Sequence, residues 1–269
     1  MKLFACMCNQ PQRLAAALAP VRAALVAQPP VSRWGLGYVQ GGDVLLVRTP
    51  KSSSTPIDLA SPLSEIKSDC AIALSVRDGA TEAPSGTDNT PPFRFRRWLF
   101  AQTGSPSASI APRLLEHVPE YLRRNIKGRT PGEVIFHLFL AMLHDEGNID
   151  DANLSTAAQR RALAATLRLV NTELERLRAE TGGTGELPRL GNIALTNGRS
   201  MLLAHLDEPL RMRRLTVTGE RGERDDSFRG VLFVSGGDGD PKDGFEDVPP
   251  SRAVLISRDL QVSFADLSS

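Results

Sequence analysis

The chain has 269 residues, and its 32 basic and 31 acidic side chains give a formal net charge of +1. This balance argues against nucleic acid or an anionic membrane as a partner, because neither would be attracted over long range. Hydrophobic residues make up 41%, an ordinary globular value, and no apolar run approaches the roughly 20 residues that span a bilayer.

The first third of the chain predicts strands after one early helix. Pro29-Pro30 ends the Ala- and Leu-rich helix, and Gly41-Gly42 between two apolar runs is typical of a hairpin turn. Residues 50–62 and 80–92 are rich in Ser, Pro, Thr and Gly and are expected to be loops. The predicted elements are a strand at 3–8, a helix at 11–27 and strands at 34–40, 43–49, 70–77 and 96–104.

The middle of the chain predicts helices, and the last third returns to strands. A proline and a glutamate mark the first turn of a strongly apolar helix at 131–145, and Gly182-Gly183 ends a long amphipathic one at 155–180. Asn197-Gly198 predicts a tight hairpin turn. The other predicted elements are a short helix at 111–124 and strands within 190–206, 211–219, 230–237 and 252–267, with loops at 219–228 and 236–247.

This order of strands, helices and strands indicates an α+β protein. Alternating βα units are absent from the pattern, which argues against a doubly wound parallel sheet. We therefore expect one domain over residues 1–269, built from two antiparallel sheets stacked face to face with helices outside.

Eight short segments, each weak alone, follow one another in a distinctive order. They are Lys2–Asn9, Arg33–Tyr38, Ser75–Arg77, Asn89–Phe93, Trp98–Gly104, Gly128–Glu133, Asn192–Gly198 and Val248–Ile256. In this order the chain resembles class II glutamine amidotransferases, in particular the short stand-alone bacterial members, over roughly 2–145 and 190–262. The resemblance implies the fold of N-terminal-nucleophile hydrolases, a four-layer αββα sandwich.

The resemblance also implies that the catalytic nucleophile is missing. In the family, the thiol of the first residue attacks the glutamine amide and its own amine is the base. The matching position here is Met1, whose thioether cannot form the thioester. Lys2 is too large to favour removal of an initiator methionine, so we expect Met1 to stay. Cleavage that exposed Cys6 or Cys8 would consume the first strand.

Other positions of the implied pocket depart from the family as well. Thr103 stands where the family has its oxyanion asparagine, and Pro131 replaces the aspartate that binds the substrate amine. Arg77 is the charged pocket group that remains; it could hold a small carboxylate or pair with Asp78 or Glu82. The expected degenerate pocket, with no catalytic residue, comprises Met1, Trp34, Arg77, Asn89, Thr90, Gln102, Thr103, Gly104 and Pro131.

No metal or other cofactor is expected. His137 and His144 lie two turns apart on one predicted helix, but neither they nor His117 and His205 come with the further ligands that zinc needs. The Cys6-Met7-Cys8 spacing likewise lacks a second Cys or His cluster. Aspartates 238, 240 and 243 fall in a loop whose spacing fails as a calcium site, because Pro249 occupies the position of the last ligand.

Two basic clusters remain as candidate docking surfaces. They are Arg94, Arg96 and Arg97, interleaved with aromatic residues, and Arg211, Arg213 and Arg214. On a strand the aromatic residues of the first cluster would split between two faces, which disfavours a single-stranded nucleic-acid stripe. A protein partner accounts for both clusters better.

Together these observations favour a non-catalytic binding or regulatory subunit of a protein complex. One alternative is an active amidotransferase or amidohydrolase that uses a processed or non-standard nucleophile. A second alternative is a nucleic-acid-associated protein, which the charge balance disfavours. The three sparse cysteines and the absence of a signal-peptide pattern predict a cytoplasmic location without a membrane span.

Overall fold

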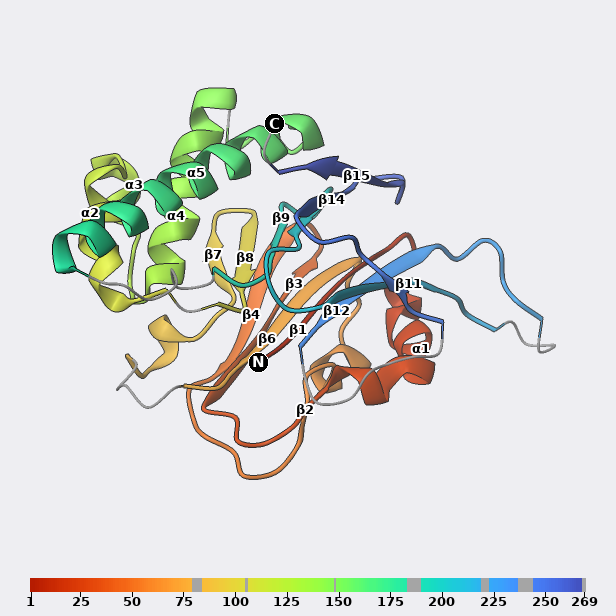
Figure 1. Cartoon of the computed structure of the whole chain (residues 1–269). Coiled ribbons are helices and arrows are strands. Elements are labelled where there is room, and N and C mark those ends of the chain that lie inside the picture. Colours follow the sequence, from red (N-terminus) through yellow and green to blue (C-terminus); the bar gives the residue numbers. More distant parts are fainter. Residues whose placement is uncertain are drawn as a thin grey trace.

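Two large antiparallel sheets organise the protein, with helices packed beside them (Figure 1). The computed structural model describes residues 1–78, 84–104, 106–147, 149–182, 190–218, 223–236 and 244–267. Within this part of the chain the architecture is α+β, as the order of elements predicts. No described helix is both long and apolar enough to cross a membrane.

The first sheet has seven strands in the order β13-β11-β12-β1-β6-β3-β4, all antiparallel to their neighbours. Its central strand is β1, which pairs with β6 on one side and β12 on the other, and all seven of its residues are buried. The strands are β1 (Lys2–Cys8), β3 (Arg33–Gln40), β4 (Asp43–Thr49), β6 (Cys70–Val76), β11 (Leu210–Leu215), β12 (Gly230–Ser235) and β13 (Glu246–Asp247).

The second sheet has six strands in the order β15-β14-β10-β9-β8-β7, and a two-stranded ribbon of β2 and β5 lies apart from both sheets. The strands of the second sheet are β7 (Phe93–Phe95), β8 (Trp98–Gln102), β9 (Ile193–Thr196), β10 (Met201–Ala204), β14 (Arg252–Ile256) and β15 (Val262–Asp266). The ribbon strands are β2 (Val26–Ala27) and β5 (Ile57–Asp58).

Helices flank the two sheets on opposite sides in Figure 1, with α2 to α5 near the second sheet and α1 near the first. The α-helices are α1 (Leu14–Leu18), α2 (Ala111–Glu116), α3 (Glu120–Arg123), α4 (Pro131–Glu146) and α5 (Thr156–Thr181). Short 3-10 helices lie at Pro11–Arg13, Ala19–Leu25, Ser61–Ser64, Thr87–Asn89 and Ala108–Ile110. The long predicted helix is α5, capped by the Ser155 side chain and ended by Gly182 in a left-handed conformation.

Three hydrophobic clusters follow from strand alternation. On β1, Leu3 and Ala5 point between the sheets, whereas Phe4 and Cys6 point to the outer side of the first sheet. The inter-sheet cluster joins both sheets, the second cluster packs α2, α4 and α5 on the second sheet, and the third packs α1 on the first sheet.

Three predicted elements are corrected. The helix expected at 11–27 is a broken run of 3-10 and α turns, because Pro20 lacks the N–H that a continuous helix needs there. The helix expected at 111–124 divides into α2 and α3, since Pro119 caps α3 instead of continuing α2. The strand expected at 96–104 begins at Trp98, because Arg96 adopts a left-handed φ of 52° in the β7–β8 turn.

Candidate functional site

A small cavity of about 60 Å³ lies where β1 begins, between the first turn of α4 and the edges of both sheets. Its walls come from segments that are far apart in the sequence. They are Met1, Arg33, Val76, Pro84, Asn89, Pro91, Phe93, Gln102, Gly104, Thr130, Pro131 and Gly132. The structure thus gathers part of the expected pocket: Met1, Asn89, Gln102, Gly104 and Pro131.

Trp34, one of the expected pocket residues, lies on the other face of the first sheet. Successive residues of β3 alternate, so Leu36 and Trp34 pack in the cluster beside α1. Arg33 points between the sheets instead. The strand period therefore places Arg33, and not Trp34, at the cavity.

Arg77 also lies outside this cavity. Its guanidinium donates to the backbone carbonyls of Pro30 at 3.1 Å, Pro29 at 3.3 Å and Gln28 at 3.5 Å. It lines a neighbouring cavity of about 170 Å³ together with Met1, Lys2, Gln28, Pro30, Ser75, Val76 and Glu208. The arginine thus holds the proline-rich loop before β3.

The expected pairing of Arg77 with Asp78 is wrong. Asp78 accepts from Nη1 of Arg33 through both carboxylate oxygens, at 2.7 and 2.6 Å. Glu82, the other expected partner of Arg77, lies outside the described residues. Arg33 is only 8% exposed and is the cation that the sequence reasoning missed. Its place before Trp34 on an alternating strand was the signal that could have found it.

Thr103, which the resemblance places at the oxyanion position, forms hydrogen bonds within the fold. Its Oγ1 accepts from the Asn192 backbone N–H at 2.8 Å, and its own N–H donates to the Asn192 carbonyl at 2.9 Å. Asn192 in turn donates its side-chain amide to Ser235 Oγ at 2.7 Å. Thr103 therefore links β8 to the start of β9, and it does not line the cavity.

At Gly104, the residue after Thr103, the backbone lies very close to the backbone of Leu190 and Gly191. A Cβ built on Gly104 would lie 2.1 Å from the carbonyl oxygen of Leu190, and one on Gly191 would lie 1.9 Å from the Gly104 nitrogen. Gly191 also has a left-handed φ of 69°. Both positions require glycine, so this wall of the cavity is fixed by backbone packing.

Three buried polar atoms around Met1 have no hydrogen-bond partner among the described residues: Arg33 Nε, Gln102 Oε1 and Glu208 Oε2. Gln102 uses its amide nitrogen on the Leu190 carbonyl, so its oxygen is an unused acceptor in the cavity wall. Buried polar groups are satisfied in most proteins, and a cluster of exceptions needs an explanation such as water or a ligand.

The remaining wall is the start of α4. Thr130 caps the helix by accepting from the Glu133 N–H, and Pro131 takes the first helical position. The Glu133 carboxylate turns back to accept from the backbone N–H groups of Lys127 at 3.0 Å and Gly128 at 2.7 Å, and burial raises its pKa. The resemblance of Gly128–Glu133 to the family's helix start is thus accounted for by capping.

No protein-family model and no curated protein match the chain. Solved structures that are similar over nearly the whole chain include the following two. One is a glutamine aminotransferase class-II domain protein from Silicibacter pomeroyi, at 18% identity, a TM-score of 0.59 and full coverage of both chains. The other is a predicted glutamine amidotransferase from Pseudomonas aeruginosa, at 14% identity and a TM-score of 0.51, with 97% of this chain and 99% of that one covered. At these identities the likeness shows a shared fold.

Asn89 and Thr90 hold the loop beside the cavity. Asn89 Oδ1 accepts from the Arg129 N–H at 2.7 Å, and its amide nitrogen donates to the Ser85 carbonyl at 2.6 Å. Thr90 is fully buried and donates its hydroxyl to the Gly86 carbonyl at 2.9 Å. Asn89 reaches the cavity wall, whereas Thr90 does not.

Lys2 is a buried cation immediately behind Met1. Its Nζ donates to the Gly236 carbonyl at 2.9 Å. Burial, together with the nearby charge of Arg211, lowers the pKa of Lys2 to about 8. The ammonium is therefore held in a place that disfavours its charge.

The three thiols are buried and poorly suited to nucleophilic attack. Burial raises the pKa of Cys6 and Cys70, and raises that of Cys8 to about 12. Three histidines contact groups of the chain: His137 Nδ1 lies 2.9 Å from the Glu133 carbonyl oxygen, His205 Nδ1 lies 2.8 Å from that of Val248, and His117 Nε2 lies 3.3 Å from the Glu173 carboxylate. In the described part of the chain no three potential ligands converge on a metal site. Aspartates 238, 240 and 243 lie outside it.

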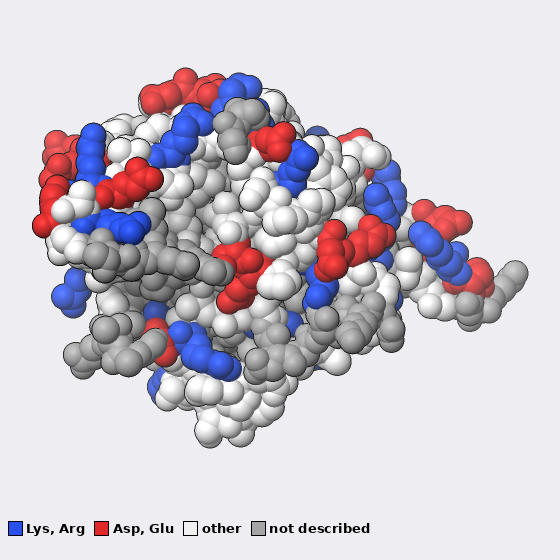
Figure 2. All heavy atoms as spheres, viewed as in Figure 1, with Lys and Arg blue, Asp and Glu red and all other residues white. Residues whose placement is uncertain are grey.

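The two basic clusters are largely occupied by contacts within the chain. Arg96 pairs with Asp150, and Arg94 donates to the Val44 carbonyl at 2.8 Å. Arg211 pairs with Asp247 at 2.9 Å, and Arg213 lies 5.6 Å from the Phe245 ring centre. Figure 2 shows basic and acidic side chains interspersed over one face of the molecule.

Proposed function

We propose that this protein is a catalytically inactive relative of class II glutamine amidotransferases that acts by binding, as a regulatory subunit of a protein complex. The observation that carries the proposal is the place of Met1. It precedes the central strand β1 and lines the cavity that Gln102, Gly104 and Pro131 also line. A thioether there offers no nucleophile, and the residue that would match the oxyanion asparagine is committed to Asn192.

The position of β1 weighs against a nucleophile that processing exposes. Cleavage before Cys6 or Cys8 would remove most of a strand that is paired on both edges at the centre of the first sheet. Both thiols also point to the outer side of that sheet, away from Met1. Neither cysteine therefore fits the role of a catalytic thiol in this fold.

The size and charge of the cavity also support a non-catalytic role. Pockets that enclose a small-molecule ligand usually measure about 300–1,000 Å³. The cavity of about 60 Å³ has room for a few water molecules. Its cation, Arg33, is already paired with Asp78, and Pro131 supplies no charge. Glutamine would need both a larger space and a group for its amine.

For the finer architecture we propose a single domain with the four-layer arrangement of N-terminal-nucleophile hydrolases. The three hydrophobic clusters and the two similar structures support this assignment. We propose a small carboxylate as the ligand of the neighbouring cavity of about 170 Å³, because the cations of Lys2 and Arg77 line it. We also propose a cytoplasmic location, because the three cysteines are buried and unpaired.

The experiment that tests this function combines two readings of one purified sample. The intact mass should show that Met1 is retained, and incubation with glutamine should release no ammonia above the buffer background. Ammonia release that persists through repeated purification would refute the inactive assignment. An intact mass that corresponds to a chain beginning at Cys6 or Cys8 in such a sample would identify processing as the route to activity.

A further inference from the structure

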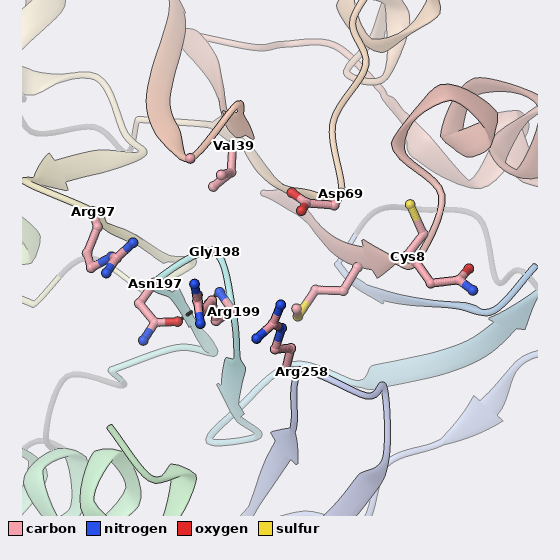
Figure 3. A pocket seen from close by; sticks show the side chains of 11 residues that line it. Cys8, Val39, Asp69, Arg97, Asn197, Gly198, Arg199 and Arg258 are labelled. Atoms are coloured by element: carbon pink, nitrogen blue, oxygen red, sulfur yellow. Dashed lines mark hydrogen bonds between the residues drawn. The ribbon is translucent and has the colours of Figure 1, made fainter. Parts of the chain in front are cut away.

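A much larger cavity lies at the opposite end of the two sheets, where β1 and β3 end and β6 and β10 begin (Figure 3). Its volume is about 400 Å³, within the range of pockets that hold small molecules. Hairpin turns of both sheets form its rim. The cavity of about 60 Å³ beside Met1, called the Met1 cavity from here on, shares no lining residue with it.

Three arginines from three separate hairpins of the second sheet line this cavity. Arg97 lies in the β7–β8 turn, Arg199 in the β9–β10 turn and Arg258 in the β14–β15 turn. Figure 3 shows the three guanidinium groups directed toward the space between the strand ends. The convergence is created by the fold, because the three residues are far apart in the sequence.

These three cations form no ion pair with a residue that the structure describes. Among the described residues none of them has a carboxylate oxygen within 4.0 Å, the ion-pair distance. Arg199 donates to the Asn153 side-chain oxygen at 2.8 Å, and Arg97 makes a long contact of 3.4 Å with the Asp150 carbonyl. The Nε of Arg97 is buried without a partner, and Arg258 makes no hydrogen bond within the described chain.

Neighbouring arginines on the same hairpins behave differently. Arg96, directly before Arg97, pairs with Asp150. Arg252, on the strand that leads to Arg258, pairs with Asp266 at 2.7 Å. Among the described residues, carboxylates thus pair with these neighbouring arginines and not with the three that line the cavity.

The opposite wall carries a different kind of group. Asp69, directly before β6, points toward the cavity in Figure 3 and forms no ion pair with a described residue. Burial raises its pKa, so its carboxyl suits a hydrogen bond with a neutral polar group. Gly42 leaves the rim open, because a Cβ there would meet nothing within 4 Å.

We propose that this cavity binds a small phosphate monoester, with the phosphate among Arg97, Arg199 and Arg258 and a hydroxyl of the ligand toward Asp69. Guanidinium groups donate paired hydrogen bonds to phosphate oxygens, and three of them match a dianion that offers three oxygens. A monocarboxylate would leave part of this charge unmatched. The site is independent of the Met1 cavity, so either assignment can fail alone.

Calorimetric titration of the full chain tests the proposal with matched probes. The probes are inorganic phosphate, glucose 6-phosphate and glucuronate, which replaces the phosphate ester by a carboxylate on a similar sugar. We expect both phosphates to bind saturably and glucuronate to bind at least about tenfold more weakly. Binding should weaken as salt is raised.

Variants locate the binding. Arg258→Gln should weaken phosphate binding about tenfold or more without changing the fold, because Arg258 is exposed and forms no hydrogen bond or ion pair with a described residue. Arg199→Gln should act in the same direction. The control is Arg124→Gln, at an exposed arginine directly after α3. Equal binding by Arg258→Gln and the unmodified chain, equal affinity for glucuronate, or no saturable binding of either phosphate would overturn the proposal.

Discussion

The two ends of the paired sheets use charged groups in opposite ways. Where β1 begins, Arg33 is buried and neutralised by Asp78, and the chain closes tightly around Met1 at Gly104 and Gly191. Where β1 ends, three arginines line an open cavity without ion pairs among the described residues. A buried arginine that is paired with a carboxylate is compatible with a stable fold, whereas three arginines that repel one another without ion pairs cost stability, which a bound anion would offset.

We call the end of the sheets where β1 begins the Met1 end, and the end with the three arginines the arginine end. The largest expected effect tests how tightly the Met1 end is packed. Gly191→Ala should lower the free energy of unfolding by about 4 kcal/mol, since it adds an overlap with Gly104 to the cost of a left-handed alanine. The matched control is Gly42→Ala at the other end, where φ is also left-handed at 91° but the space is empty. It should cost about 1–2 kcal/mol. Urea unfolding measures both, and equal losses would show that the close approach is absent.

The next effect concerns the neutralised charge of the Met1 end. Asp78→Asn leaves Arg33 buried without its counter-charge and should lower the free energy of unfolding by about 3 kcal/mol. The control is Glu120→Gln, which breaks the exposed pair with Arg124 and should cost about 0.5 kcal/mol or less. Denaturant unfolding at low salt compares the two. A small loss for Asp78→Asn would mean that Arg33 is neutralised by another group.

The buried ammonium of Lys2 gives a pH-dependent effect. Its pKa in the folded chain is about 8, below its ordinary value of 10.5, so between these values the unfolded chain binds more protons. Stability from this group therefore rises from pH 8 to 10.5. The unmodified chain should gain about 2 kcal/mol over this window relative to Lys2→Met, as measured by urea unfolding at each pH.

The control for Lys2 is Lys51→Met, at an exposed lysine whose ammonium stays in water. Its stability should follow the unmodified chain across the same pH range. If Lys2→Met showed the same rise as the unmodified chain, the ammonium at the start of β1 would be solvated and the Met1 end would be looser than described.

The smallest expected effect distinguishes the arginine end from the Met1 end. Arg258→Gln should change the free energy of unfolding by no more than about 0.5 kcal/mol, and any change should be an increase, because repulsion from Arg97 and Arg199 is relieved. Thermal unfolding in phosphate-free buffer measures it. A loss of several kcal/mol would show that Arg258 supports the fold and would remove the contrast between the two ends.

Much of the fold could be predicted because its signals are local. Gly41-Gly42 and Asn197-Gly198 both mark turns between paired strands, and Ser155 and Gly182 mark the ends of α5. The early helix failed because Pro20 interrupts a pattern that otherwise has helical spacing. A proline removes one backbone hydrogen bond of a helix, and the spacing of apolar residues does not show whether the helix continues past that position.

The candidate sites could be predicted only in part. The resemblance expected Met1, Gln102 and Pro131 in one pocket, and the three residues line one cavity. It also expected Trp34 there, which lies on the other face of β3, and it missed Arg33. Of the three arginines in the larger cavity, the sequence singled out only Arg97, as part of a basic cluster. Strand alternation indicates which face a side chain takes, whereas the meeting of three hairpin tips depends on how the strands are ordered in the second sheet.

One measurement tests the central claim, that the Met1 end does not hydrolyse glutamine and that the arginine end binds phosphate. Amide NMR spectra of the full chain can be followed while glutamine and then inorganic phosphate are added, with ammonia assayed in the same sample. We expect no ammonia, and phosphate should shift the amide signals of Gly42 and Gly198 while those of Gly104 and Gly132 stay in place. Release of ammonia, or phosphate shifts centred on Gly104 and Gly132, would contradict the account.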